Sequence, residues 1–177
     1  MNEQVGEGAV IQMGYVVDSL DDTIDDWVSR LGIGPWFILP NFSGLKPLYL
    51  GKECLAKNDL AFAYSNGMQY ELIMPLDEHA SVWNQTRPKA GSAFHHFGVA
   101  TTNVPGRGAA LTSKGCRLVY TDELRGGGQV AYLNAGDFLP GMIELLPFDD
   151  GFRAMFDLVR EASLNWNGDD PIRHMPA

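Results

Sequence analysis

Hydrophobic residues change their spacing repeatedly along the first half of the chain. An apolar run from Ala9 to Val17 is typical of a buried strand. The segment "DSLDDTIDDWVSRLG" then places apolar residues at helical spacing and ends at Gly32, which predicts a helix. Further strands are predicted in "GPWFILPNF" and in "LYLGKECLAKNDLAFAYSNGMQYELIMP", where Ser65-Asn66-Gly67 is typical of a tight hairpin turn.

The second half repeats this order of elements. A strand is predicted in "SAFHHFGVATTN", a helix in "VPGRGAALTSKG", and short strands in "CRLVYTD", "GGGQVAYLNAG" and "GMIELLP". Short sequence motifs also repeat, since "IQMGYVV" matches "HHFGVAT" and "GMQYELIMP" matches "GMIELLP". We therefore predict an α+β protein with βαβββ modules over residues 9–77 and 92–149, followed by a helix and an irregular tail over 150–177, all in one structural domain.

Four polar residues interrupt the apolar strands at equivalent positions of the repeat. Aligning the two halves places Gln12 opposite His96, and Glu71 opposite Glu144. Glutamates are almost never fully buried unless they are paired, protonated or bound to a metal. Two carboxylates neutralise a divalent cation, and glutamine and histidine add neutral ligands. These residues are candidate metal ligands, although each alone also fits a sheet edge or a salt bridge.

The neighbouring His95 is a second candidate ligand from the same strand. Adjacent strand residues face opposite sides of a sheet, so only one of the two histidines can share the face of Gln12. The register of the repeat selects His96. We expect His95 to lie outside, hydrogen-bonded or solvated.

Aromatic residues are frequent on the predicted strands. These residues either line an apolar cup suited to an aromatic or polycyclic substrate, or belong to the ordinary hydrophobic core. The candidate substrate-binding residues are Trp36, Phe37, Phe62, Tyr64 and Tyr132.

Charge and hydropathy narrow the function classes. The formal net charge is −9, which argues against general nucleic-acid binding because that function relies on neutralising phosphates. No apolar run approaches the roughly 18 residues of a membrane span, and the start of the chain lacks a signal-peptide pattern. We therefore expect a cytoplasmic protein that binds neither nucleic acid nor membrane.

The strand motifs "IQMGYVV", "YELIMP", "HHFGVA" and "GMIELLP" resemble those of the vicinal oxygen chelate superfamily, which includes glyoxalases, bleomycin resistance proteins and extradiol dioxygenases. The methylmalonyl-CoA epimerase and glyoxalase-like branches look most similar, and the resemblance covers Val10 to Phe148. It implies that the modules pair into a curved, cup-like mixed sheet around a divalent metal ion (Zn, Co, Ni, Mn or Fe). The implied ligands are Gln12, Glu71, His96 and Glu144.

The resemblance also implies a reaction. A metal-dependent isomerase or epimerase would move a proton next to a carbonyl through a metal-stabilised enolate. The base would be Glu144, with Glu71 as its partner, while Glu53 and Asp59 are alternative acids. The substrate would be a small carbonyl compound, such as an acyl-CoA or an aromatic compound. 

Glutathione is not expected as the substrate, because the positions that bind it in glyoxalase I are Val16 and Pro75 here. Two other functions stay open. One is a metal-dependent lyase or dioxygenase acting on an aromatic catabolite, against which Gln12 counts because ring-cleaving enzymes use histidine there. The other is a metal-free small-molecule binding protein of the same fold. The tail "NWNGDDPIRHMPA" either packs loosely or latches onto a second subunit, so a homodimer is also considered.

Overall fold

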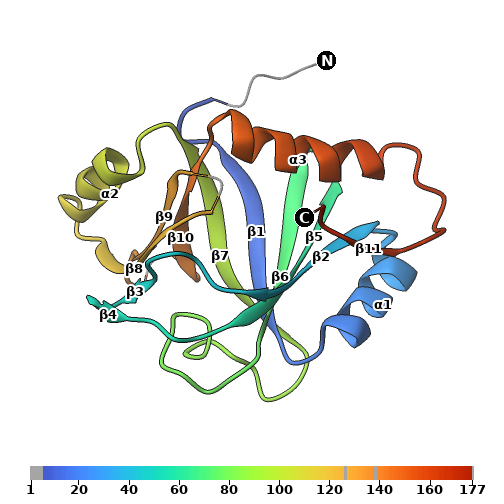
Figure 1. Ribbon diagram of the computed structural model, residues 1–177, viewed down its shortest axis with the longest axis horizontal. Coiled ribbons are helices and arrows are strands. Elements are labelled where there is room, and N and C mark those ends of the chain that lie inside the picture. Colours follow the sequence, from blue (N-terminus) through green and yellow to red (C-terminus); the bar gives the residue numbers. More distant parts are fainter. Residues whose placement is uncertain (1–5, 126, 138, 177) are drawn as a thin grey trace.

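The computed structural model of the protein describes residues 6–125, 127–137 and 139–176 (Figure 1). The first part of the chain forms β1 (Val10–Val17), α1 (Leu20–Leu31), β2 (Trp36–Phe42), β3 (Leu48–Tyr49), β4 (Lys52–Glu53), β5 (Asn58–Ser65) and β6 (Met68–Pro75). The second part forms β7 (Ser92–Thr101), α2 (Val104–Thr112), β8 (Arg117–Glu123), β9 (Gln129–Asn134), β10 (Met142–Pro147), α3 (Asp150–Ser163) and β11 (Ile172–His174).

The strands form one curled mixed sheet in the order β11-β2-β5-β6-β1-β7-β10-β9-β8-β3-β4. At its centre β1 runs antiparallel to β7, the first strand of the second repeat. Each of these strands pairs in parallel with the last strand of its own repeat, β1 with β6 and β7 with β10. The two repeats are therefore related about the β1–β7 pair, and the expected α+β fold is confirmed.

Local sequence signals explain where the elements begin and end. Ser19 caps α1 by accepting a hydrogen bond from the Asp22 amide, and Gly32 ends the helix with a left-handed backbone (φ 64°). The β5–β6 hairpin turns through Asn66 (φ 49°) and Gly67 (φ 87°), the backbone that an Asn-Gly turn favours. These boundaries agree with the predictions from the sequence.

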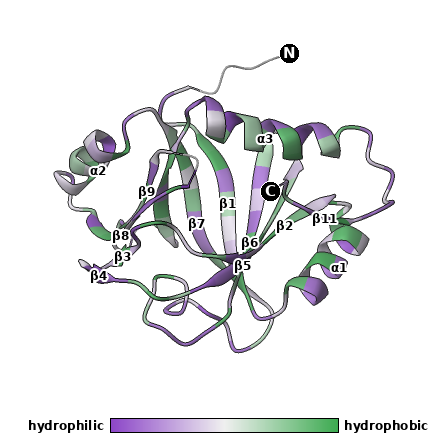
Figure 2. Ribbon diagram, viewed as in Figure 1, coloured by the Kyte–Doolittle hydropathy of each residue, from purple (hydrophilic) through white to green (hydrophobic). Residues whose placement is uncertain are grey.

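The helices cover both faces of the sheet. Helix α1 buries Leu20 and Ile24 in one apolar cluster, and α2 buries Val104 in another. Helix α3 instead places Phe156 and Val159 in the largest cluster, on the other face. Hydrophobic and hydrophilic bands alternate along α1 and α3, as expected for helices that bury one side (Figure 2). In the part of the chain that the structure describes, none of the helices is long and apolar enough to span a membrane.

Two connections complete the sheet. The segment between β2 and β5 reaches the far end, where β3 pairs with β8 of the second repeat. The C-terminal tail forms β11, which pairs in parallel with β2 of the same chain. Backbone hydrogen bonds from Trp36 to Pro171 (2.8 Å) and from Met175 to Ile38 (2.9 Å) hold this strand. The sequence predicted an irregular tail because its apolar pattern is too short to reveal a three-residue edge strand.

Candidate metal centre

The structure brings the four predicted ligand side chains together at the centre of the sheet. They come from its four central strands, with Gln12 on β1, Glu71 on β6, His96 on β7 and Glu144 on β10. The His96 Nε2 atom lies 3.1 Å from Gln12 Oε1, 3.3 Å from Glu71 Oε2 and 2.9 Å from Glu144 Oε2. One ring nitrogen therefore faces three oxygen atoms.

Two glycines make room for this cluster. Gly14 lies opposite His96 in the β1–β7 register, and a β-carbon on Gly14 would lie 1.9 Å from His96 Cε1. Gly98 lies opposite Gln12, and a β-carbon there would lie 2.8 Å from Gln12 Oε1. His96 and Gln12 thus each occupy the space left by the glycine across from them. The signal was present in the sequence as a glycine two residues after each ligand, in "QMG" and "HFG".

The oxygen atoms of the cluster are short of partners. Glu71 and Glu144 are each 6% exposed, and among the described residues neither Oε2 atom meets the geometry of a hydrogen bond. Both lie within ion-pair distance of His96 Nε2, but one N–H can serve only one of them. Buried carboxylate oxygens without partners are costly, so a further positive charge would relieve the cluster.

The donor set fits a divalent cation. Ligand atoms of Glu71, His96 and Glu144 all lie within 4.8 Å of one another. Donors that bind one cation at about 2.1 Å lie roughly 3–4 Å apart, so a small contraction would suffice. One imidazole nitrogen, one amide oxygen and two carboxylates suit a first-row divalent metal. Gln12, Glu71, His96 and Glu144 are therefore the residues that would hold it.

Electrostatics tie the ionisable groups of the cluster to one another. Burial alone would lower the pKa of His96, but the adjacent Glu144 and Glu71 carboxylates raise it to about 9. Burial raises the pKa of Glu71; the His96 ring at 3.3 Å opposes this, and the negative charge of Glu144 adds to it. Burial and the same two carboxylates keep the pKa of the Tyr132 hydroxyl well above its ordinary value. Tyr132 is therefore a proton donor in hydrogen bonds at neutral pH.

Gln69 orients the amide of Gln12. The two residues are partners in the β1–β6 register, and Gln12 Nε2 donates a 2.8 Å hydrogen bond to Gln69 Oε1. The Gln12 carbonyl oxygen is consequently the atom that faces His96 Nε2. Gln69 is not identifiable as a partner of Gln12 from the sequence, because the β1–β6 register cannot be read from it.

The expectation that His95 lies outside the cup is corrected by the structure. His95 is fully buried, and its Nδ1 lies 3.0 Å from Nδ1 of His96. The cause is a β-bulge: Gly14 pairs with His96 and Tyr15 with Phe94, so β7 contains one extra residue there. Strict alternation of side chains fails at this point, and both histidine rings contact the Tyr132 ring.

A cavity of about 910 Å³ opens onto the cluster. Of the predicted substrate-binding residues, Phe62 and Tyr132 line it. Trp36 lies on the other face, in the cluster under α1, since neighbouring residues of a strand point to opposite sides. Phe37 is part of the core cluster on the cavity side but does not line the cavity. Tyr64 is half-buried and packs against the same cluster. These three therefore do not reach the cavity.

Other lining residues were not predicted. Trp83 comes from the β6–β7 loop, Tyr120 from β8, and Phe152 and Met155 from α3. Nothing in a single sequence indicates that a C-terminal helix folds over the cup. The alternative acids lie elsewhere: Glu53 is exposed on β4, and Asp59 accepts a hydrogen bond from the Asn41 amide at 2.7 Å. Neither belongs to the cavity lining.

Comparisons with solved structures agree with this architecture. Methylmalonyl-CoA epimerase from Mycobacterium tuberculosis is 20% identical with a TM-score of 0.57, over 87% of this chain and 96% of that chain. A hypothetical protein from Bacillus halodurans C-125 is 19% identical with a TM-score of 0.57, over 79% and 94% of the two chains. A Streptomyces coelicolor methylmalonyl-CoA epimerase variant in complex with 2-nitronate-propionyl-CoA is 20% identical with a TM-score of 0.52, over 79% and 96%.

At these identities the structural similarity concerns the fold. No match is found among curated proteins. The model of the Glyoxalase/Bleomycin resistance protein/Dioxygenase superfamily matches residues 11–132, which include three of the four clustered side chains and the repeat boundary. The chain belongs to the Glyoxalase/Bleomycin resistance protein/Dioxygenase superfamily.

Proposed function

We propose that the protein is a metal-dependent isomerase or epimerase that moves a proton next to a carbonyl group. The observation that carries this proposal is the convergence of Gln12, Glu71 and Glu144 on His96 Nε2 at the floor of a cavity. A structural role alone would not require two buried carboxylates with unpartnered oxygens at repeat-equivalent positions.

A bound divalent cation would supply positive charge that makes a carbon next to a carbonyl more acidic. The carboxylates supply the base. Glu144 or Glu71 takes the proton from the carbon through an oxygen that faces the cavity. The electron pair of the C–H bond forms the C=C bond of an enolate, and the π pair of the carbonyl moves to its oxygen. For isomerisation the same carboxylic acid returns the proton to a neighbouring carbon; for epimerisation the other glutamate, in its acid form, delivers a proton to the opposite face and the first keeps the one it took.

Tyr132 lines the cavity, and burial raises the pKa of its hydroxyl, which lies near enough to Glu144 and Glu71 for these carboxylates to raise that pKa further. Its ring lies 5.3 Å from the His96 ring, and its hydroxyl stays protonated at neutral pH. We propose that this hydroxyl donates a hydrogen bond to the substrate oxygen on which negative charge develops. A phenol in that place also excludes water from the carboxylates.

The walls of the cavity favour a carbonyl compound with an apolar body. Apolar side chains from several strands and from α3 form most of the lining, including Leu60, Phe62, Leu146, Phe152 and Met155. Solved relatives of the same fold were crystallised with 2-nitronate-propionyl-CoA or methylmalonyl-CoA. A coenzyme A thioester brings several phosphate charges, however, whereas Lys57 and Arg125 are the cations among the lining residues of the described chain. We therefore rank an aromatic or alicyclic ketone above an acyl-CoA.

The proposal is tested by purifying the protein without chelator, measuring bound metal by mass spectrometry, and following deuterium exchange in ²H₂O by NMR. The substrate panel should contain α-keto compounds, β-diketones with aromatic rings and acyl-CoA thioesters. We expect one divalent ion per chain and metal-dependent exchange. Glu144→Gln should abolish exchange, while the exposed control Glu161→Gln should leave it unchanged. Oxygen consumption with a ring-bearing substrate would instead identify a dioxygenase.

A second candidate function is metal-free binding of a small molecule. It is favoured by the 2.9 Å contact between His96 Nε2 and Glu144, because a protonated histidine could itself hold the carboxylates together. A protein that holds no stoichiometric ion under metal-replete conditions, yet binds ring-bearing ketones, would establish this function and overturn the catalytic one.

A further inference from the structure

His95 forms a hydrogen-bonded chain with the candidate ligand His96. The two Nδ1 atoms are 3.0 Å apart, and the rings are perpendicular with centroids separated by 5.2 Å. On the other side of the ring, His95 Nε2 lies 3.2 Å from the carbonyl oxygen of Val82. Both ring nitrogens of the fully buried His95 are therefore engaged.

The hydrogen-bonding partners determine which nitrogen of each histidine ring carries a hydrogen in the series Val82–His95–His96. The Val82 carbonyl can only accept, so His95 Nε2 must carry the hydrogen and donate it. His95 is fully buried, and among the described residues its ring nitrogens meet only the His96 ring and the Val82 carbonyl, so a positive charge on it would be left without a counter-charge and the ring is neutral. A neutral ring with a hydrogen on Nε2 has a lone pair on Nδ1. His96 Nδ1 must then be the donor in the contact between the two histidines.

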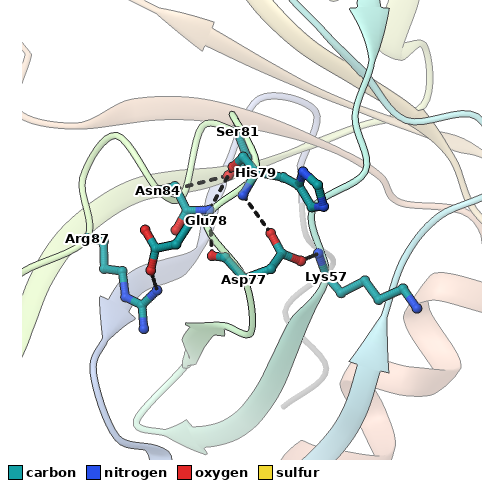
Figure 3. A network of polar contacts seen from close by, with 7 residues as sticks. All are labelled: Lys57, Asp77, Glu78, His79, Ser81, Asn84 and Arg87. Atoms are coloured by element: carbon teal, nitrogen blue, oxygen red, sulfur yellow. Dashed lines mark hydrogen bonds and ion pairs between the residues drawn. The ribbon is translucent and has the colours of Figure 1, made fainter.

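The loop between β6 and β7, which contains Val82, has its own polar network (Figure 3). Asp77 accepts hydrogen bonds from the backbone amides of Lys57 and His79, each at 2.9 Å. The side chain of Asn84 donates to the carbonyls of Asp77 (3.0 Å) and His79 (2.7 Å). Val82 is fully buried and lies between Ser81 and Asn84, which are joined by a 3.1 Å hydrogen bond from the Asn84 amide to Ser81 Oγ. The loop therefore presents its carbonyl to His95 from a fixed position.

We propose that His95 is a positioning residue that keeps the hydrogen of His96 on Nδ1, so that Nε2 is the ring nitrogen offered to a divalent cation. The inference rests on the proposed metal centre of Gln12, Glu71, His96 and Glu144. It assigns a role to the β-bulge, because without the extra residue in β7 the His95 ring would point to the other face. It also links the β6–β7 loop to the centre, through one carbonyl and one imidazole.

The first test removes and restores the acceptor. His95→Leu has similar volume and no acceptor, whereas His95→Asn keeps an oxygen near the place of Nδ1. Isothermal titration with Zn²⁺ and Co²⁺ should show affinity reduced about 10- to 100-fold in His95→Leu and largely recovered in His95→Asn. Val99→Ala is the matched control, since it removes a buried side chain from the cluster on the opposite face of β7 and should change affinity less than twofold. Unchanged affinity in His95→Leu would overturn the proposal.

The second test needs no metal. Nitrogen-15 spectra of histidine-labelled protein should show His95 with hydrogen on Nε2 and a lone pair on Nδ1, and His96 with hydrogen on Nδ1. The four histidines of the chain can be assigned from single substitutions. A hydrogen on His95 Nδ1 would overturn the assignment even if the protein binds metal. If the spectra agree but the wild-type protein binds no divalent cation, the assignment of the protons is borne out and the proposed metal function fails.

Discussion

The imidazole ring of His96 fills the space that a side chain on Gly14 would occupy. A β-carbon on Gly14 would lie 1.9 Å from Cε1 and 2.3 Å from Nδ1 of His96, so the imidazole occupies the place where any other residue would have its side chain. Because Gly14 has no side chain, the His96 ring packs against the backbone of β1. His96 is consequently held by shape as well as by hydrogen bonds.

Gly14→Ala should therefore displace the His96 ring and weaken metal binding by at least tenfold, while destabilising the fold by about 1–3 kcal/mol from overpacking. Titration calorimetry and urea unfolding measure the two effects. Gly108→Ala is the matched control, because a β-carbon at this helical glycine would meet Leu145 at an ordinary 3.8 Å. We expect Gly108→Ala to leave metal affinity unchanged; equal affinity in both variants would contradict the proposed packing role of Gly14.

The internal repeat made the central cluster predictable. It paired Gln12 with His96 and Glu71 with Glu144, and the structure places these four side chains together because β1 and β7 are neighbours at the centre of the sheet. The alignment of the two halves was sufficient for this pairing, without knowledge of how the strands pair in the sheet. The face of His95 was predicted wrongly, because a β-bulge in β7 breaks the two-residue alternation of side chains.

The Gln12 amide should lose its orientation when its acceptor is removed. Gln69→Met has similar volume and leaves Gln12 Nε2 without its 2.8 Å partner, at a cost of about 1–3 kcal/mol for a buried donor. Metal affinity should fall about tenfold. A double-mutant cycle with Gln12→Ala measures the coupling, and a coupling near zero would show that the two amides act independently.

The metal-free protein should become less stable as the pH rises from about 6.5 to about 9. His96 has a pKa of about 9 when folded and an ordinary value of 6.5, so its contribution is complete below 6.5 and is lost as pH rises through 9. The span corresponds to about 3 kcal/mol. Urea unfolding in the presence of a chelator measures the decline. His96→Gln should lack it, and a flat profile in the wild-type protein would contradict the ion pairs with Glu71 and Glu144.

The residues around the cavity were harder to predict than the cluster. Trp36 and Phe37 were both expected in the cup, yet consecutive strand residues cannot share a face, and the pairing of β2 with β5 sends Trp36 under α1. The contribution of α3 depends on a long-range packing choice that a single helix pattern leaves open. An amphipathic helix shows which of its sides is buried, but not which face of a sheet will bury it.

The two phenylalanines of α3 should have different roles, Phe156 in packing and Phe152 in ligand binding. Phe156 is buried against Phe148 in the core and does not line the cavity, so Phe156→Ala should cost about 3–5 kcal/mol in unfolding free energy. Phe152 lines the cavity and is only partly buried, so Phe152→Ala should cost less and act mainly on ligands. With benzoylacetone as the probe in titration calorimetry, we expect Phe152→Ala to weaken binding several-fold. If Phe152→Ala leaves the affinity for this ring-bearing diketone unchanged, α3 serves only the fold, and the preference for apolar ketones must come from the strands.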